Sequence, residues 1–297
     1  MSKYDSLAIV ISFYSLWISS YLSDIYEVIL GIILILTFGI YHGANDILIS
    51  SKFLSNGKAK NSITILVFYV FQVLLALLLF YLSPLLGLLL FILASSYHFG
   101  EQQLSFLKTI LPETYLRIYA LSYGLMLFFL LFMMHPAEVV AIVKQITFFT
   151  IDAQHIYYGF VIFMCVFLLF TFLVLIAYPK SRGSLFYQFL FLGVYAIIFK
   201  VSSLIWGFAI YFIVWHSIPS MQLQTIFIYG SLSRFHFFKY VKDAFLYWIL
   251  SVLAIGLFYY FQSTSKFFIT VIFSFFSAIT YPHAFVIFKM LQQKKTE

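Results

Sequence analysis

Apolar runs long enough to cross a lipid bilayer recur along the whole 297-residue chain. A helix needs about 20 consecutive apolar residues to span the hydrocarbon core, and the polar gaps between these runs are too short for a soluble domain. Only 9% of the residues are charged, whereas soluble domains carry about 25%. The sequence therefore predicts one membrane-embedded domain over residues 1–297, an all-α polytopic membrane protein.

We expect about ten transmembrane helices, within a range of eight to ten. The first is expected to be a retained helix, because no convincing cleavage site of a signal peptide follows it. Two readings stay open for residues 185–221: two short helices that break near Lys200–Ser203, or one span with a re-entrant element. The expected spans are residues 7–22, 28–49, 63–82, 85–104, 116–134, 156–178, 184–199, 201–219, 244–261 and 267–289.

Basic residues are distributed unevenly between the loops. With the N- and C-termini in the cytoplasm, 14 of the 17 lysines and arginines fall on that side, as the positive-inside rule requires. The net charge of +7 then reflects orientation in the membrane, so no nucleic-acid partner is expected. We expect a multi-pass protein of the cell (inner) membrane. Residues 222–243 are typical either of a helix on the anionic inner leaflet or of an ordinary cytoplasmic loop.

Four histidines lie inside apolar segments, in expected spans that all run from outside to inside: His42, His98, His216 and His283. Each is roughly 14–17 residues from the outer end of its span, or about 20–25 Å at the rise of an α-helix. Imidazole is rare in hydrocarbon without a partner, so four at one depth favour a shared metal ion over four separate structural roles. Imidazole suits iron, copper, zinc and nickel alike, and the only cysteine, Cys165, is not near these positions.

Several neighbours of these histidines are candidates to bond or orient the ligands. Asp46 follows the first histidine by four residues and Glu101 follows the second by three, spacings that share a helical face. Metal-bound histidines usually donate their second ring proton to such a group, although both carboxylates could simply mark helix ends. Gly43 and Gly100 would allow close helix approach or reflect ordinary packing. The full set of candidate partners is Tyr41, Asp46, Tyr97 and Glu101.

The other three histidines are expected to be structural. His135 and His155 border the loop between the expected spans 116–134 and 156–178, and His236 lies in the basic segment 222–243. These are solvated or interfacial positions, where an imidazole needs no special partner.

The motifs around the four histidines resemble those of the Brp/Blh family, the membrane-integral β-carotene 15,15′-dioxygenases of bacteria and archaea. The resemblance covers nearly the whole chain, and four motifs carry it: Tyr41-His42-Gly43-Ala44-Asn45-Asp46, Ser96-Tyr97-His98-Phe99-Gly100, Phe212-Ile213-Val214-Trp215-His216-Ser217 and Tyr281-Pro282-His283. In the family, the first motif often has a histidine after its aspartate, where this chain has Ile47, and a proline before its ligand, where this chain has Tyr41.

The resemblance implies a catalytic ferrous ion, Fe(2+), held by His42, His98, His216 and His283. It also implies cleavage of the central double bond of β-carotene, or of a related carotenoid, by O2 to give two retinal molecules. Substrate would enter from the membrane lipid, and a retinal-binding opsin is a potential functional partner.

Other functions remain open at this point. An accessory protein could bind carotenoid or retinal without cleaving it. A transporter could use the histidines as a proton relay, although such proteins usually carry more carboxylates in their spans than Asp46 alone. A di-iron desaturase would need closely spaced histidine clusters, which this chain lacks, and a b-type cytochrome would show a Soret absorption band.

Overall fold

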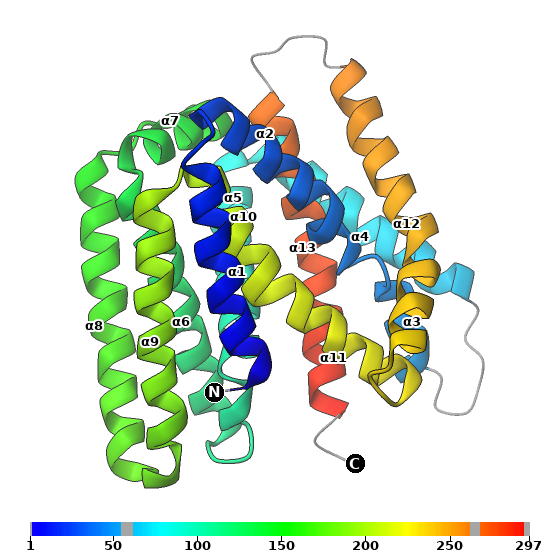
Figure 1. Cartoon of the computed structure of the whole chain (residues 1–297). Coiled ribbons are helices and arrows are strands. Elements are labelled where there is room, and N and C mark those ends of the chain that lie inside the picture. Colours follow the sequence, from blue (N-terminus) through cyan, green and yellow to red (C-terminus); the bar gives the residue numbers. More distant parts are fainter. Residues whose placement is uncertain (1, 55–61, 262–267, 294–297) are drawn as a thin grey trace. The chain divides into compact units, whose positions relative to one another are not determined.

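The computed structural model describes residues 2–54, 62–261 and 268–293, and these residues are almost entirely helical (Figure 1). The predicted all-α class is therefore confirmed. The α-helices are α1 (Lys3–Ser19), α2 (Asp24–Leu34), α3 (Asp46–Leu54), α4 (Ser62–Leu82), α5 (Pro84–Gln103), α6 (Glu113–Met134), α7 (Pro136–Thr147), α8 (Ala153–Ala177), α9 (Arg182–Val201), α10 (Leu204–Ile210), α11 (Ile218–Tyr229), α12 (Arg234–Phe261) and α13 (Phe268–Gln293).

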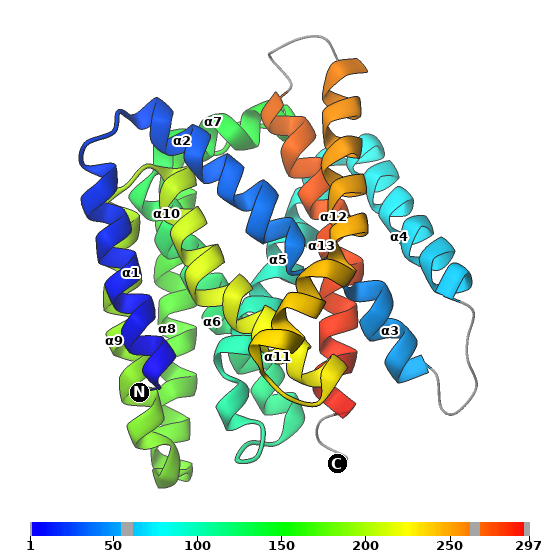
Figure 2. The same cartoon turned by 45° about the vertical axis from the view of Figure 1, so that its right-hand side comes forward.

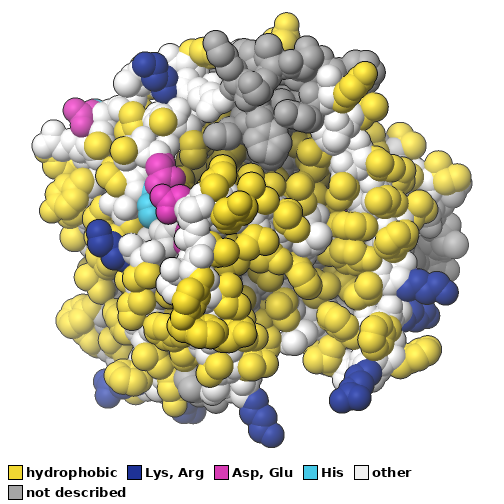
Figure 3. Space-filling model, turned by 45° about the horizontal axis from the view of Figure 1, so that its top comes forward, with side chains coloured by type: hydrophobic (Ala, Val, Ile, Leu, Met, Phe, Trp, Pro, Cys, Tyr) yellow, Lys and Arg dark blue, Asp and Glu magenta, His cyan; other side chains and the backbone are white. Residues whose placement is uncertain are grey.

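Within the described residues, seven helical segments are long and apolar enough to cross a membrane. The most apolar is α8, with a mean hydropathy of 3.1, and it exposes large side chains such as Leu169, Phe172 and Ile176. Hydrophobic side chains cover most of the face shown in Figure 3. A surface of this kind is stable in lipid rather than in water, so the chain is a polytopic membrane protein. The exact number of ten spans and the cytoplasmic termini stay predictions.

The expected span over residues 28–49 is not one continuous helix, so that prediction was wrong. Helix α2 ends at Leu34, a π-helical turn follows over Ile35–Gly39, and the chain makes turns at residues 42–45 before α3 begins at Asp46. Asn45 and Asp46 are each only 1% exposed. A buried amide and a buried carboxylate both need hydrogen-bond partners, which the partners described below supply.

The break expected near Lys200–Ser203 is confirmed, but the two helices around it are not short. Helix α9 ends at Val201, and the Ser203 hydroxyl caps α10 by accepting the Trp206 N–H at 3.4 Å. The Ser203 N–H itself donates to the buried carboxylate of Glu27 at 2.8 Å. From Leu204 the helical run continues through a second π-helical turn, Tyr211–Ser217, to Tyr229, and its 26 residues are enough to cross a membrane.

Residues 222–243 form neither a separate surface helix nor a plain loop, so both readings of this segment were wrong. Its first part completes α11, which ends at Tyr229 and is followed by Gly230 with a φ of 85°. Glycine adopts this left-handed conformation without steric cost and is common after a helix. Its last part, from Arg234, is the start of the 28-residue helix α12. The stretch between α6 and α8, expected as a loop, contains the helix α7.

The chain divides into two compact units, each assembled from segments that are distant in sequence. The first unit comprises Met1–Ile35, Ser95–Ala141 and Thr150–His216, and the second comprises Leu36–Ala94, Ile142–Phe149 and Ser217–Glu297. In the first unit, α6 packs against α8 and α9, α1 packs against α9, and α10 contacts α2 (Figures 1 and 2). In the second, α13 packs against α3, α4 and α12. The single-domain organisation stays a prediction.

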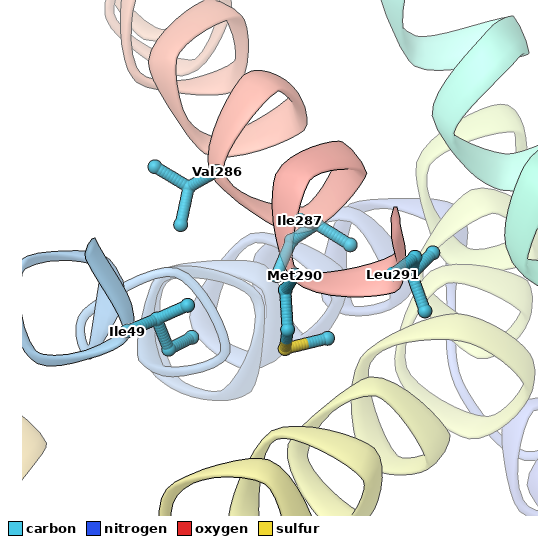
Figure 4. Close-up of a cluster of buried hydrophobic side chains, with 5 residues drawn as sticks. All are labelled: Ile49, Val286, Ile287, Met290 and Leu291. Carbon is cyan, nitrogen blue, oxygen red and sulfur yellow. The ribbon is translucent and has the colours of Figure 1, made fainter. Parts of the chain in front are cut away.

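An apolar cluster holds α3 against α13 in the second unit (Figure 4). Ile49 of α3 is fully buried, and Ile287 and Met290 of α13 are each 2% exposed. Val286 and Leu291 complete the cluster. Close packing of these side chains fixes α3, which begins at Asp46, relative to the C-terminal part of α13, just after His283.

Candidate metal centre

The first unit brings His98 and His216 together. His98 lies on α5 and His216 lies in the π-helical turn Tyr211–Ser217. Their ring centroids are 4.7 Å apart with an interplanar angle of 81°, and the residues are 2% and 1% exposed. The ring centroids of Phe99 and His216 are 4.4 Å apart, and Phe212 also stacks on His216, so aromatic side chains pack against the pair.

The second unit brings His42 and His283 together in a similar arrangement. His42 lies in the turn that follows the first π-helical turn, and His283 lies on α13 directly after Pro282. Their ring centroids are 4.6 Å apart with an interplanar angle of 85°, and the residues are 5% and 3% exposed. Each unit therefore holds one buried pair of histidines with nearly perpendicular rings.

Hydrogen bonds define which nitrogen of each ring in the second unit carries a proton. His283 Nδ1 lies 2.9 and 3.1 Å from the two carboxylate oxygens of Asp46, and His42 Nδ1 contacts the carbonyl oxygen of Gly39. Both acceptors require a proton on Nδ1, which leaves the lone pair of a neutral imidazole on Nε2. This is the tautomer of metal-binding histidines whose other nitrogen donates to a carboxylate or a carbonyl. The residues present fit a metal ion.

Asp46 contributes to this site through a different histidine from the one the sequence indicates. Because α3 begins only at Asp46, His42 and Asp46 do not share a helical face, and that expectation was wrong. The carboxylate bonds His283 instead, and it also accepts the Tyr69 hydroxyl of α4 at 2.7 Å. Tyr69 had no signal in the sequence, since a tyrosine in an apolar run is ordinary.

The other candidate partners point elsewhere. Glu101 pairs with Lys108 at 3.2 Å and hydrogen-bonds the Tyr97 side chain. The Tyr41 hydroxyl donates to the carbonyl of Val241 at 3.0 Å. These contacts tie helix ends and loops together, and they make a structural role the simplest reading of Tyr41, Tyr97 and Glu101.

Two glycines, one of them Gly100, allow α5 and α6 to touch beside the first histidine pair. A methyl group added at Gly100 would lie 1.8 Å from the carbonyl oxygen of Ala120, and one added at Gly124 would lie 1.8 Å from that of Ser96. In the second unit, a methyl group at Gly43 would lie 3.3 Å from His283 Nδ1. Small residues at a helix contact let the backbones of membrane helices approach closely.

The three remaining histidines have ordinary partners. His135 Nε2 is 2.7 Å from the carbonyl oxygen of Phe199, and His135 Nδ1 is 3.3 Å from Glu138. His155 is exposed in the first turn of α8, and the half-buried His236 stacks on the half-buried Tyr229. These contacts are consistent with structural roles.

An apolar pocket lies beside the histidine pair of the first unit. Phe99 links the two, because it lines the pocket and also contacts the ring of His216. Phe208, another lining residue, stacks on Phe212, which in turn stacks on His216, each with an interplanar angle of 11°. The pocket is lined by Phe99, Leu127, Phe128, Leu131, Phe199, Phe208 and Tyr211.

The fold and the site define a helical membrane protein with paired, buried histidines. The family described as beta-carotene 15,15′-dioxygenase matches residues 33–291, a range that contains all four of these histidines. The chain belongs to this family, as the resemblance of its motifs indicated. The comparison with curated proteins and the comparison with solved structures returned no match.

Proposed function

We propose that this chain is a non-haem iron oxygenase that cleaves the central 15,15′ double bond of β-carotene to give two molecules of all-trans-retinal. The observation that carries the proposal is the buried pair of perpendicular imidazoles in each unit of a chain that belongs to this family. In the reaction the C15=C15′ bond breaks, and each of the two carbons gains one of the two atoms of O2 as an aldehyde oxygen. No other oxidant is needed.

We propose that His42, His98, His216 and His283 together hold one ferrous ion. The support is their shared depth in the expected spans, their burial and the proton on Nδ1 that the partners of His42 and His283 require. Four neutral imidazoles would leave positions open on a metal that favours six ligands. Ferrous iron would supply the activation of dioxygen, which side chains do not provide.

The rest of the chain would position the substrate and exclude water. A conjugated hydrocarbon has no polar groups to recognise, so shape and apolar contact must orient it. The aromatic side chains beside His216 offer such contacts, and the flat ring faces of Phe208 and Phe212 suit a flat polyene. Carotenoid dissolved in the cell (inner) membrane would enter from the lipid, and retinal would leave for an opsin or another retinal-binding protein.

The test is expression in cells that accumulate β-carotene. The wild-type chain should bleach the orange colour and form retinal, and the purified protein should contain iron. Replacing each of the four histidines by alanine should abolish both retinal formation and bound iron. His236→Ala is the matched control, because His236 lies outside the four motifs and its ring bonds only the nearby Ser231 among the contacts described. Retinal formation by all four variants, or a purified wild-type protein that binds no iron, would refute the proposal.

A carotenoid-binding accessory protein is the second candidate, because aromatic side chains beside His216 would contact a bound polyene whether or not it is cleaved. The same variants separate the two functions. If the protein is a binder, both the wild type and His216→Ala would co-purify with intact carotenoid. If it is an oxygenase, cells with the wild type would form retinal, and cells with His216→Ala would retain uncleaved carotenoid.

A further inference from the structure

Two glutamine side chains donate hydrogen bonds to the main chain of two of the histidines. In the first unit, Gln102 Nε2 lies 2.9 Å from the carbonyl oxygen of His216. In the second unit, Gln224 Nε2 lies 2.9 Å from the carbonyl oxygen of His42. The same contact, at the same distance, thus occurs once in each unit.

Both histidines lie where the helical hydrogen-bond ladder is interrupted. His216 is in a π-helical turn that runs into Pro219, which has no N–H to donate to the carbonyls of the preceding turn, those of Val214 and Trp215. His42 follows the other π-helical turn, in a stretch where the N–H groups of Gly43 and Ala44 bond three residues back. Carbonyl groups in such stretches of a membrane protein need donors from elsewhere in the protein, because lipid offers none.

Side chains supply these donors in a parallel way in the two units. The Tyr4 hydroxyl donates to the carbonyl of Val214 in one π-helical turn. The Trp248 indole donates to the carbonyl of Leu36 in the other turn, at 3.0 Å. The glutamines extend this pattern to the ligand-bearing residues themselves.

Both polar atoms of the Gln224 amide have hydrogen-bond partners. Its Nε2 also lies 3.0 Å from the Ser220 hydroxyl, and its Oε1 accepts the Tyr240 hydroxyl at 2.8 Å. Asn45, at the end of the turn over residues 42–45 that carries His42, donates to the Tyr240 carbonyl at 3.0 Å. Gln224 and Tyr240 are fully buried, so the amide is held in one orientation with Nε2 toward His42.

Gln102 makes its contact from the helix that also carries His98. It follows His98 by four residues on α5, a spacing that places two side chains on one helical face. One face of α5 therefore presents one histidine and holds the main chain of the other.

We propose that Gln102 and Gln224 are positioning residues that clamp the main chain of His216 and His42 and thereby set the direction of these two ligands. The proposal rests on the metal centre of the proposed function. The clamp acts through the backbone, so it is separate from the Asp46 carboxylate, which acts on the ring of His283. Removing a clamp should loosen one ligand without removing it.

The experiment compares Gln102→Met and Gln224→Met with Gln103→Met in the full-length protein. Methionine keeps the length of the side chain and removes the amide. Gln103 is the matched control, because it is the next residue on α5 and its amide bonds Gln188 at 2.8 Å. The apo proteins are titrated with Co2+, whose visible absorption reports on the number and arrangement of its ligands.

We expect the two clamp variants to bind Co2+ about 10- to 100-fold more weakly, the usual effect of losing a group that orients a metal ligand. Their cobalt spectra should also differ from that of the wild type. Gln103→Met should match the wild type in both affinity and spectrum. If the three glutamines had only structural roles, each variant would have a lower thermal stability and the cobalt spectrum of the wild type. If Gln224→Met does not fold, Tyr240→Phe removes the hydroxyl that bonds Gln224 Oε1 at 2.8 Å and that also lies 3.2 Å from the carbonyl oxygen of His42. This variant should shift the spectrum in the same direction.

Two results would overturn the clamp, and they are distinguishable. A wild-type protein that binds no Co2+ and no iron would remove the metal centre and the clamp together. A wild-type protein that binds Co2+, with clamp variants equal to it in affinity and spectrum, would refute the clamp and leave the proposed function standing.

Discussion

Substituting alanine at Gly124 should separate α5 from α6 and displace His98, one of the four proposed metal ligands. The added methyl group would lie 1.8 Å from the carbonyl oxygen of Ser96 and 2.4 Å from its carbon, on the main chain of α5. Gly100 makes the reciprocal approach from α5 to Ala120 of α6. Because the obstacle in each case is backbone, no side chain can rotate away to relieve the clash.

The size of the effect follows from these distances. Real methyl groups essentially never approach a heavy atom more closely than 3.0 Å, so the two helices must separate by about 1.2 Å at this point. Overpacking of this kind typically costs about 1–3 kcal/mol of stability, and we expect the upper end. His98 lies two residues from Ser96 on the same helix. A displacement of about 1 Å can reduce turnover on the order of 100-fold.

The assay measures thermal unfolding in detergent, bound iron and retinal formation for Gly124→Ala and Gly100→Ala. Gly193→Ala on α9 is the control, because a methyl group there meets no atom within 4 Å. In a helix this control change should be neutral or slightly stabilising, since alanine has about 1 kcal/mol better helix propensity than glycine. If Gly124→Ala is as stable and as active as Gly193→Ala, the close approach of α5 and α6 does not position His98.

Three further predictions concern other parts of the two units. Asp46→Ala should weaken iron binding about 10- to 100-fold in iron titrations, because His283 loses the acceptor of its Nδ1 proton. The control is Asp243→Ala, which should leave the iron titration curve unchanged, because Asp243 accepts a hydrogen bond from a tyrosine, as Asp46 does, but is not described as bonding a histidine. Phe208→Trp should narrow the aromatic pocket and raise the KM for β-carotene about tenfold, equivalent to about 1.4 kcal/mol, while Phe186→Trp at an exposed position should not. Met290→Ala should cost about 2–5 kcal/mol of stability through a cavity in the cluster of Figure 4, read from the midpoint of thermal unfolding.

Sequence patterns predicted those features that depend on local composition. The apolar runs gave the all-α membrane class, and the polar stretch Lys200–Ser203 located a break that the structure places at Ser202 and Ser203. The four histidines were separated from His135, His155 and His236 by their apolar surroundings alone. Burial of His42, His98, His216 and His283 follows from the same surroundings.

The partners of the histidines could not be predicted, because they come from distant parts of the chain. Tyr69 lies 23 residues from Asp46, and Gln224 lies 182 residues from His42. The π-helical turns were also missed, since an extra residue in a helical turn has no distinct composition and leaves the apolar run intact. Once such a turn is known, a lone glutamine in an apolar run becomes informative, because its amide is costly in lipid unless it bonds a buried acceptor.

The interruptions of the helices argue that geometry at the histidines has been favoured over helical regularity. A π-helical turn and an unwound segment each give up regular backbone bonds, and in a membrane every such group must be satisfied again within the protein. Both interruptions described here occur at a candidate ligand, His42 or His216, and in both units an aromatic side chain and a glutamine donate hydrogen bonds to carbonyls of the interrupted stretch. If these turns served packing alone, they would have no reason to coincide with histidines in both units. Their coincidence with the buried histidine pairs supports a role in aiming the imidazoles, which is the property that a metal centre requires and that an apolar helix bundle does not.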